Sequence, residues 1–176
     1  MVDALHLLQA AADTTGAYRD FPLIGSRAAV WIAAEIHLMF AAFVLGVPIF
    51  AVVAEAIGVF GKDQRYDRLA KEFTRLLLIA YSATALWGAT FTFLLATLYP
   101  KFFAYLLSIF APSIWVYGAI FFFESFTLYL YYYGWDRWKY GRAKIVHWCL
   151  GILLNIWGTI VMFIADSWLI YDDAAA

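Results

Sequence analysis

His37 and Glu124 are ionisable side chains inside long apolar runs of this sequence, and any chemistry of the chain would start from them. His37 lies in the apolar stretch 26–58, and Glu124 lies in the apolar stretch 113–133. An ionisable group inside a run long enough to cross a bilayer costs free energy, so it is a functional-site hypothesis by default. Imidazole is a common axial ligand of haem iron. His37 is therefore a candidate metal ligand, with a haem as the group that it would hold.

Each candidate also has a plain structural explanation. His37 could be a core histidine that hydrogen-bonds Glu35, a threonine or a backbone carbonyl. Glu124 could ligate or tune the iron, or it could be a protonated glutamate bonded to a neighbouring helix, because a carboxylate in the bilayer core needs a partner or a proton. Met162 is a candidate sixth ligand, although methionine in an apolar helix usually serves packing.

The elements that must position these side chains are membrane helices. The chain is 65% hydrophobic and 14% charged, whereas soluble domains are about 45–50% apolar and about 25% charged. The sequence predicts an all-α membrane protein built as a four-transmembrane-helix bundle. Residues 1–25 are expected to form an N-terminal surface and connector segment, and residues 26–172 a four-helix transmembrane haem-binding domain. The apolar parts of the four helices are expected at 26–60, 76–99, 113–133 and 145–170.

Three further expectations concern the ends of these helices. Pro100 is expected to stop the second helix, and residues 101–112 to lie along the membrane interface before the third helix. His147 is interpreted as a histidine at the headgroup level, and Glu55 as a snorkelling or salt-bridging residue. The aromatic residues of 129–135 are expected to form an interfacial belt.

The charges predict an orientation and exclude some partners. Nine of the 12 Lys and Arg residues lie in the segments 61–75 and 134–144, so these loops are expected in the cytoplasm and both termini on the outer, periplasmic side. This corresponds to a multi-pass protein of the cytoplasmic (inner) membrane of a prokaryote. The net charge of -1 provides no basic surface for nucleic acid. One cysteine excludes an internal disulfide and a covalent c-type haem motif.

Helix rise predicts that the candidates share one layer of the bilayer. Counted from the outer helix ends, His37 lies about 16 Å deep, Glu124 about 18 Å and Met162 about 12–15 Å. Two stripes of small or polar residues recur at helical spacing, and they suit either close helix packing or a space for a flat macrocycle. The stripes contain Ala85, Gly88, Ala89 and Thr92 on the second helix, and Gly151, Asn155, Gly158, Met162 and Asp166 on the fourth.

The stretch FFFESFTLYLYYYGWDRW, residues 121–138, resembles the third helix and following loop of subunit I of the cytochrome bd quinol oxidases. That family reads FFLEST, then an aromatic-rich turn, then GWDR. The resemblance extends in order and spacing over residues 26–170. Its other parts are Ser26-Arg27 followed by His37, then Glu55, Arg68-Leu69-Ala70-Lys71, the segment from His147 to Asn155, and Ala165-Asp166-Ser167-Trp168.

The resemblance implies one haem pocket that uses His37, with Glu124 nearby. The family carries a glutamate on the second helix shortly after a Thr-Gly pair, and Thr92 stands at that place here. The family subunit also continues for several more helices, which carry the ligands of its low-spin haem b and the loop associated with quinol oxidation. A complete oxygen-reducing centre is therefore not expected in these 176 residues.

The first hypothesis is a membrane-embedded haem b subunit that relays electrons within a larger respiratory or other electron-transfer complex. Exchange of electrons with quinone is an additional option of this hypothesis. Its expected partners are other membrane subunits, periplasmic cytochrome subunits and the lipid bilayer. On this hypothesis His37 holds the iron, and Glu124, Met162, Gly88, Thr92 and Asn155 line the cofactor. A second hypothesis is a part of a split bd-type quinol:oxygen oxidoreductase. A third is a cofactor-free structural subunit of a membrane complex.

Overall fold

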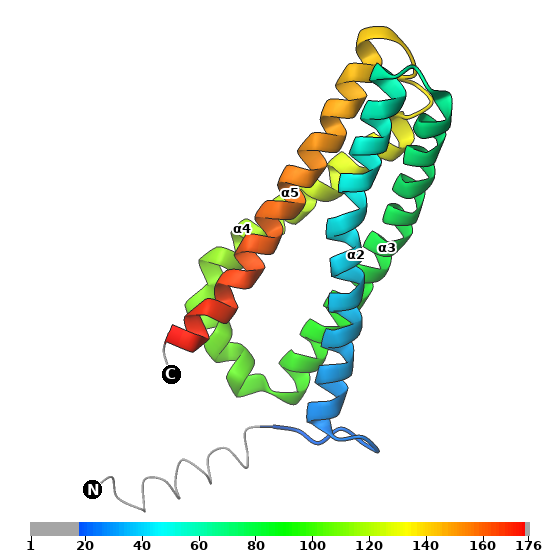
Figure 1. Cartoon of the computed structure of the whole chain (residues 1–176). Coiled ribbons are helices and arrows are strands. Elements are labelled where there is room, and N and C mark those ends of the chain that lie inside the picture. Colours follow the sequence, from blue (N-terminus) through cyan, green and yellow to red (C-terminus); the bar gives the residue numbers. More distant parts are fainter. Residues whose placement is uncertain (1–17, 175–176) are drawn as a thin grey trace, which may run out of the picture. The chain divides into compact units, whose positions relative to one another are not determined.

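A computed structural model describes the backbone of residues 18–174 and the side chains of residues 18–165. It contains four helices, α2 (Ser26–Phe60), α3 (Gln64–Leu98), α4 (Pro100–Gly134) and α5 (Gly141–Ala174) (Figure 1). All four are long and apolar enough to cross a membrane, and the described residues contain no strand. The prediction of an all-α multi-pass membrane protein is confirmed. Residues 1–17 of the predicted surface segment lie outside the described residues.

The contacts divide the helices between two compact units. Among the described residues, the first unit holds 18–38 and 85–111, and the second holds 39–84 and 112–174. The first unit thus contains the beginning of α2, the end of α3 and the beginning of α4. The surroundings of the candidate residues are described for each unit separately, because His37 belongs to the first unit and Glu124 to the second.

The corner that precedes α2 is held by backbone hydrogen bonds in the first unit. Gly25 has a positive φ of 77°, a conformation that glycine adopts without a steric cost. The Ser26 hydroxyl then donates to the carbonyl of Arg19, and the Arg19 N–H donates to the carbonyl of Leu98 at 2.8 Å. The start of α2 is thereby joined to the end of α3.

The prediction for the third helix is wrong at its beginning. Pro100 does follow the end of α3 at Leu98, but α4 starts at Pro100 and runs without interruption past Pro112. Proline fits the first turn of a helix, where its missing N–H has no intrahelical partner. Proline inside a membrane helix is also tolerated. The segment 101–112 is therefore part of α4.

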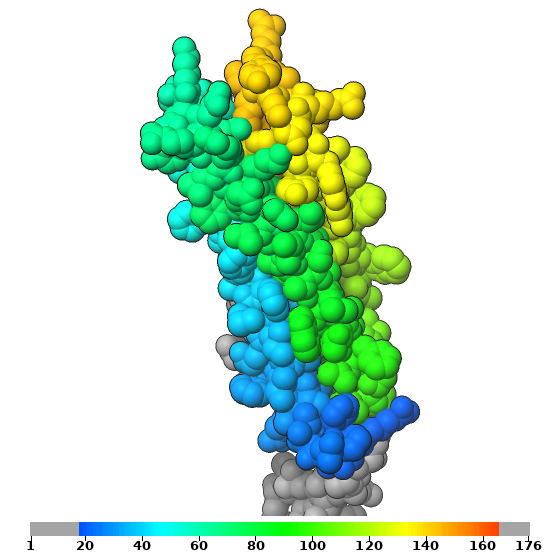
Figure 2. All heavy atoms as spheres, turned by 90° about the vertical axis from the view of Figure 1, so that its right-hand side faces the viewer, coloured from blue at the N-terminus to red at the C-terminus, as the bar shows by residue number. Residues whose placement is uncertain are grey.

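The core of the second unit takes side chains from all four helices. Val44, Leu77, Leu128 and Leu154 are each less than 9% exposed and pack in one cluster. The charged segments 61–75 and 134–144 lie at the same end of this unit (Figure 2). There Lys71 and Asp136 form an ion pair at 2.8 Å. Many large apolar side chains remain exposed, as the lipid-facing surface of a membrane helix requires. Examples are Phe50, Leu76, Ile79, Phe122, Phe126 and Phe163.

Candidate functional site

His37 lies directly against the backbone of α3 in the first unit. A Cβ atom added to Gly88 would stand only 2.8 Å from His37 Cε1 and 3.1 Å from Nδ1. Thr92 is exposed, and its hydroxyl donates to the carbonyl of Gly88 at 2.9 Å. The predicted small stripe on the second helix therefore reaches His37 at Gly88. Whether these residues line a cofactor remains a prediction.

The surroundings of His37 fit one axial imidazole of a haem. The imidazole supplies a nitrogen donor of the kind that haem iron takes. Because Gly88 has no side chain, the His37 ring can lie against the backbone of α3. Even a methyl group at Gly88 would occupy this space. No group of three or more His, Cys, Asp or Glu side chains within the described residues could hold a metal ion. A haem site differs from such a cluster, because the porphyrin provides the equatorial ligands.

Glu124 is buried in the second unit between α3 and α5. It is 5% exposed, and the Tyr81 hydroxyl lies 3.4 Å from its Oε2 atom. The same hydroxyl is 2.7 Å from Ser125 Oγ. On the other side, a Cβ atom at Gly158 would stand 3.2 Å from Glu124 Oε1. Glu124 thus has a polar neighbour on another helix, as its structural explanation requires.

The candidate residues on α5, Asn155 and Met162, are in surroundings that do not indicate a ligand role. Met162 is 42% exposed, and the Asn155 amide donates to the carbonyl of Gly151 in its own helix at 2.9 Å. Glu124 and Met162 belong to the second unit, and so does Asn155. The layer predicted for His37, Glu124 and Met162 therefore stays a prediction.

The small residues of α5 serve close packing at one end of their stripe. A Cβ atom at Gly151 would stand 2.7 Å from Val52 Cγ2 and 2.9 Å from Tyr131 Cε2. α2 and α4 thus both press against α5 at Gly151. The packing explanation therefore accounts for Gly151 without a macrocycle.

His147 is covered by protein and is not exposed at the membrane interface, whereas its depth at the headgroup level stays a prediction. Its side chain is fully buried, with Nδ1 2.6 Å from Glu55 Oε1 and Nε2 2.7 Å from the carbonyl oxygen of Tyr131. It lies three residues after Lys144 at the beginning of α5, and partners from α2 and α4 cover it. The salt-bridging interpretation of Glu55 is confirmed by Lys144, whose Nζ lies 2.8 Å away.

The aromatic belt is also only partly as expected. Tyr131 and Trp135 are 0% and 2% exposed and belong to the core, whereas Tyr129 and Tyr133 face outward. Helical periodicity over 129–135 could have separated these two faces.

The exposed loop charges pair locally at the end of the second unit. Hydrogen bonds from Lys71 and then Lys139 lower the pKa of Asp136 to about 2. The hydrogen bond from Arg65 lowers the pKa of Asp63. These pairs link or order the two charged segments without forming a ligand site.

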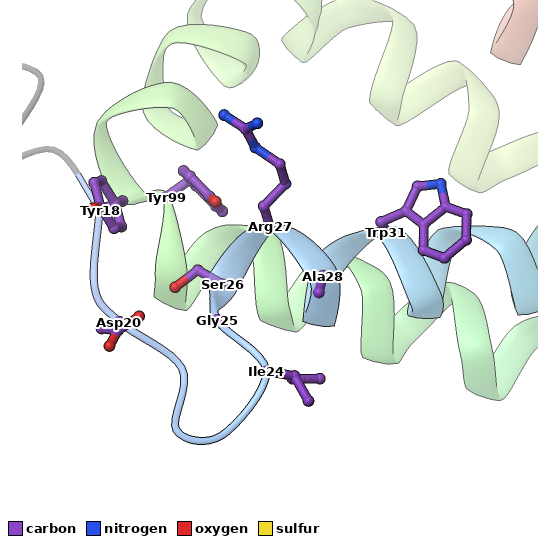
Figure 3. A pocket seen from close by; sticks show the side chains of 9 residues that line it. All are labelled: Tyr18, Asp20, Ile24, Gly25, Ser26, Arg27, Ala28, Trp31 and Tyr99. Atoms are coloured by element: carbon purple, nitrogen blue, oxygen red, sulfur yellow. The ribbon is translucent and has the colours of Figure 1, made fainter.

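A cavity of about 620 Å³ opens at the beginning of α2 in the first unit (Figure 3). Arg27 and Trp31 project from the first turns of α2, and Tyr99 follows the end of α3. Tyr18 stacks on Tyr99 with ring centroids 6.0 Å apart. Sequence reasoning gave this cavity no role, since its lining comes from two segments about 70 residues apart in sequence. The complete lining is Tyr18, Asp20, Ile24, Gly25, Ser26, Arg27, Ala28, Trp31 and Tyr99.

Comparison with known proteins finds similarity to a family model and to a solved structure. The family model described as cytochrome bd terminal oxidase subunit I matches residues 26–171. The solved structure of the bd oxidase from Geobacillus thermodenitrificans matches with a TM-score of 0.71 and 27% sequence identity. That match covers 80% of this chain and 32% of the Geobacillus chain. The present sequence thus spans about a third of that relative.

Proposed function

Because the chain belongs to the cytochrome bd terminal oxidase subunit I family, we propose that it is a membrane subunit that binds haem b and relays electrons within a larger respiratory complex. The observation that carries this proposal is the contact of His37 with Gly88, where a Cβ atom would stand 2.8 Å from the ring. An imidazole held against a bare helix backbone is suited to present one nitrogen in a fixed direction. A haem bound there would supply one-electron oxidation and reduction.

The protein residues have separate tasks in this proposal. His37 ligates the iron, and Gly88 holds the ring in place without occupying the space beside it. The roles that the sequence suggests for Glu124 as the acidic group, Asn155 as a lining residue and Met162 as the sixth ligand rest on the sequence alone, because these residues belong to the second unit. The long distance of 3.4 Å between Tyr81 and Glu124 leaves that carboxyl group able to accept another donor.

Thr92 favours electron relay over oxygen reduction. It stands where the resembling family has a glutamate, and its hydroxyl is engaged with the carbonyl of Gly88. A threonine cannot take up and release a proton at neutral pH as a carboxyl group can. Proton delivery to oxygen at this position would therefore need another group.

The family also guides the proposals for partners and location. The protein would lie in the cytoplasmic membrane of a prokaryote, with its two charged loops in the cytoplasm and both termini outside. Its partners would be other membrane subunits and periplasmic cytochromes, and it could exchange electrons with quinone. The second candidate is a part of a bd-type quinol:oxygen oxidoreductase, which the match to the Geobacillus structure at a TM-score of 0.71 favours.

The reduced-minus-oxidised absorption spectrum of the purified protein tests the haem. We expect haem b bands in the native protein and their loss in the variant His37→Ala. The matched control is Leu38→Ala, because Leu38 is the next residue, is large and is 58% exposed. Bands that persist in His37→Ala would refute the role of His37, and a native protein without bands would support a cofactor-free structural subunit. Quinol-driven oxygen uptake by the intact complex would favour the second candidate.

A further inference from the structure

Four charged side chains from three helices meet inside the second unit, at the end where α2 finishes and α5 begins. Glu55 of α2 is fully buried, and the side chain of Lys144 of α5 is 9% exposed. Lys144 Nζ lies 2.8 Å from Glu55 Oε1 and 2.6 Å from Asp67 Oδ1 of α3. His147 of α5 contacts the same Glu55 oxygen at 2.6 Å. Tyr131 of α4 adds its hydroxyl, so all four helices contribute to one polar cluster.

The hydrogen bonds of His147 determine how many protons the group must hold. Nε2 lies 2.7 Å from the carbonyl oxygen of Tyr131, and a carbonyl only accepts, so Nε2 carries a proton. Nδ1 lies 2.6 Å from Glu55 Oε1, and this contact also needs a proton. Either His147 is an imidazolium beside a carboxylate, or Glu55 is a carboxylic acid that donates to a neutral ring.

The other neighbours of Glu55 favour the ionised pair. Its Oε2 atom accepts the Tyr131 hydroxyl at 2.6 Å, and its Oε1 atom faces the Lys144 ammonium at 2.8 Å. Several donors and a nearby cation stabilise a carboxylate over its protonated form. Trp135 stabilises the Lys144 ammonium group, because Lys144 Nζ lies 4.3 Å from the centroid of the Trp135 ring and aromatic faces attract positive charge.

We propose that Glu55, Asp67, Lys144 and His147 form a charge-neutral lock in which His147 is held as an imidazolium. Two carboxylates and two cations leave no net charge in the cluster, which is the condition under which ionic groups are tolerated in a protein interior. The lock joins the ends of α2, α3 and α5, and Tyr131 attaches α4 to it. Both ring nitrogens of His147 are occupied, so His147 is a structural cation and not an iron ligand.

Nitrogen-15 NMR of histidine-labelled full-length protein in lipid nanodiscs tests the protonation directly. The chain has three histidines, and the His147 signals are assigned as those that remain when His6→Gln and His37→Ala remove the other two. We expect both ring nitrogens of His147 to show the shifts of protonated nitrogen at pH 7.5. An unprotonated Nδ1 would overturn the proposal, because it would place the proton on Glu55.

Charge-removing variants test the lock through thermal stability. Glu55→Gln and His147→Gln each leave the cluster with an unbalanced charge, so each should lower the Tm. The double variant restores neutrality and should recover most of that loss. Losses that simply add in the double variant would overturn the lock. The control is Lys71→Gln with Asp136→Asn, an equally short but exposed pair at the same end, for which little loss is expected. Where a variant does not fold, the NMR spectrum of the native chain decides.

Discussion

Replacing Gly88 by alanine tests whether the backbone of α3 determines the position of His37. The new Cβ atom would stand 2.8 Å from His37 Cε1, whereas carbon atoms in favourable contact lie about 3.5–4.0 Å apart. The ring or the helix must therefore move by about 0.7–1.2 Å. Overpacking of this kind costs about 1–3 kcal/mol, and glycine-to-alanine replacement inside a helix returns about 1 kcal/mol. The net effect on stability should lie between about zero and 2 kcal/mol of destabilisation.

Gly46→Ala is the matched control for this measurement. Gly46 also lies inside a helix, and nothing stands within 4 Å of the Cβ atom that would be added there. Its replacement should therefore show the helix-propensity gain alone. Denaturant unfolding should find Gly88→Ala less stable than Gly46→Ala by about 1–3 kcal/mol.

The haem spectrum provides the second measurement on the same two variants. Gly88→Ala should weaken or shift the haem bands, because it displaces the proposed ligand, and Gly46→Ala should leave them unchanged. Equal stability and equal spectra for the two variants would show that α3 does not constrain His37. The reasoning from the close approach at Gly88 would then be refuted.

Two further predictions concern the second unit. Lowering the pH should destabilise the protein as Asp136 takes up its proton, from about its ordinary pKa of 3.8 down to its lowered pKa of about 2, because a carboxylate with a lowered pKa contributes stability only while ionised. Asp136→Asn should flatten the fall of Tm over this range, and an unchanged slope would contradict the role of Lys71 and Lys139. Gly151→Ala should destabilise the protein by about 1–3 kcal/mol in denaturant unfolding. The reason is that the new Cβ atom would stand 2.7 Å from Val52 Cγ2 and 2.9 Å from Tyr131 Cε2. Stability equal to that of Gly46→Ala would count against this packing.

The helices could be predicted from the sequence because each apolar run is long enough to cross a bilayer. Their ends could be predicted less well, and the beginning of α4 shows why. Pro100 was interpreted as a stop and Pro112 as a boundary, but a proline is compatible with the first turn of a helix and with the interior of a membrane helix. Only tertiary contacts decide between these uses of proline.

The candidate site shows a similar division. The recurrence of small residues on the second helix indicated a place of close approach, and Gly88 does lie against the His37 ring. The role of His147 could not be predicted from its surroundings in sequence. Its partner Glu55 is 92 residues away, and the place of His147 three residues after Lys144, at the start of the fourth apolar run, indicates only that it lies near a helix end. A buried salt bridge depends on which helix ends are in contact, and the sequence pattern around one residue does not indicate this contact.

The two buried glutamates of the second unit differ in how completely the fold satisfies them. Glu55 has a hydroxyl, an imidazole and an ammonium group at 2.6, 2.6 and 2.8 Å. These contacts offset the cost of burying its charge, so its position inside the bundle needs no ligand. Glu124 is almost equally buried, but its hydrogen bond from Tyr81 is long at 3.4 Å. A contact of that length contributes little, and a buried carboxyl group that is weakly held favours a further donor or a proton. Burial alone would assign function to both residues, whereas the quality of their hydrogen bonds separates the structural Glu55 from Glu124, for which a role at the cofactor stays a proposal.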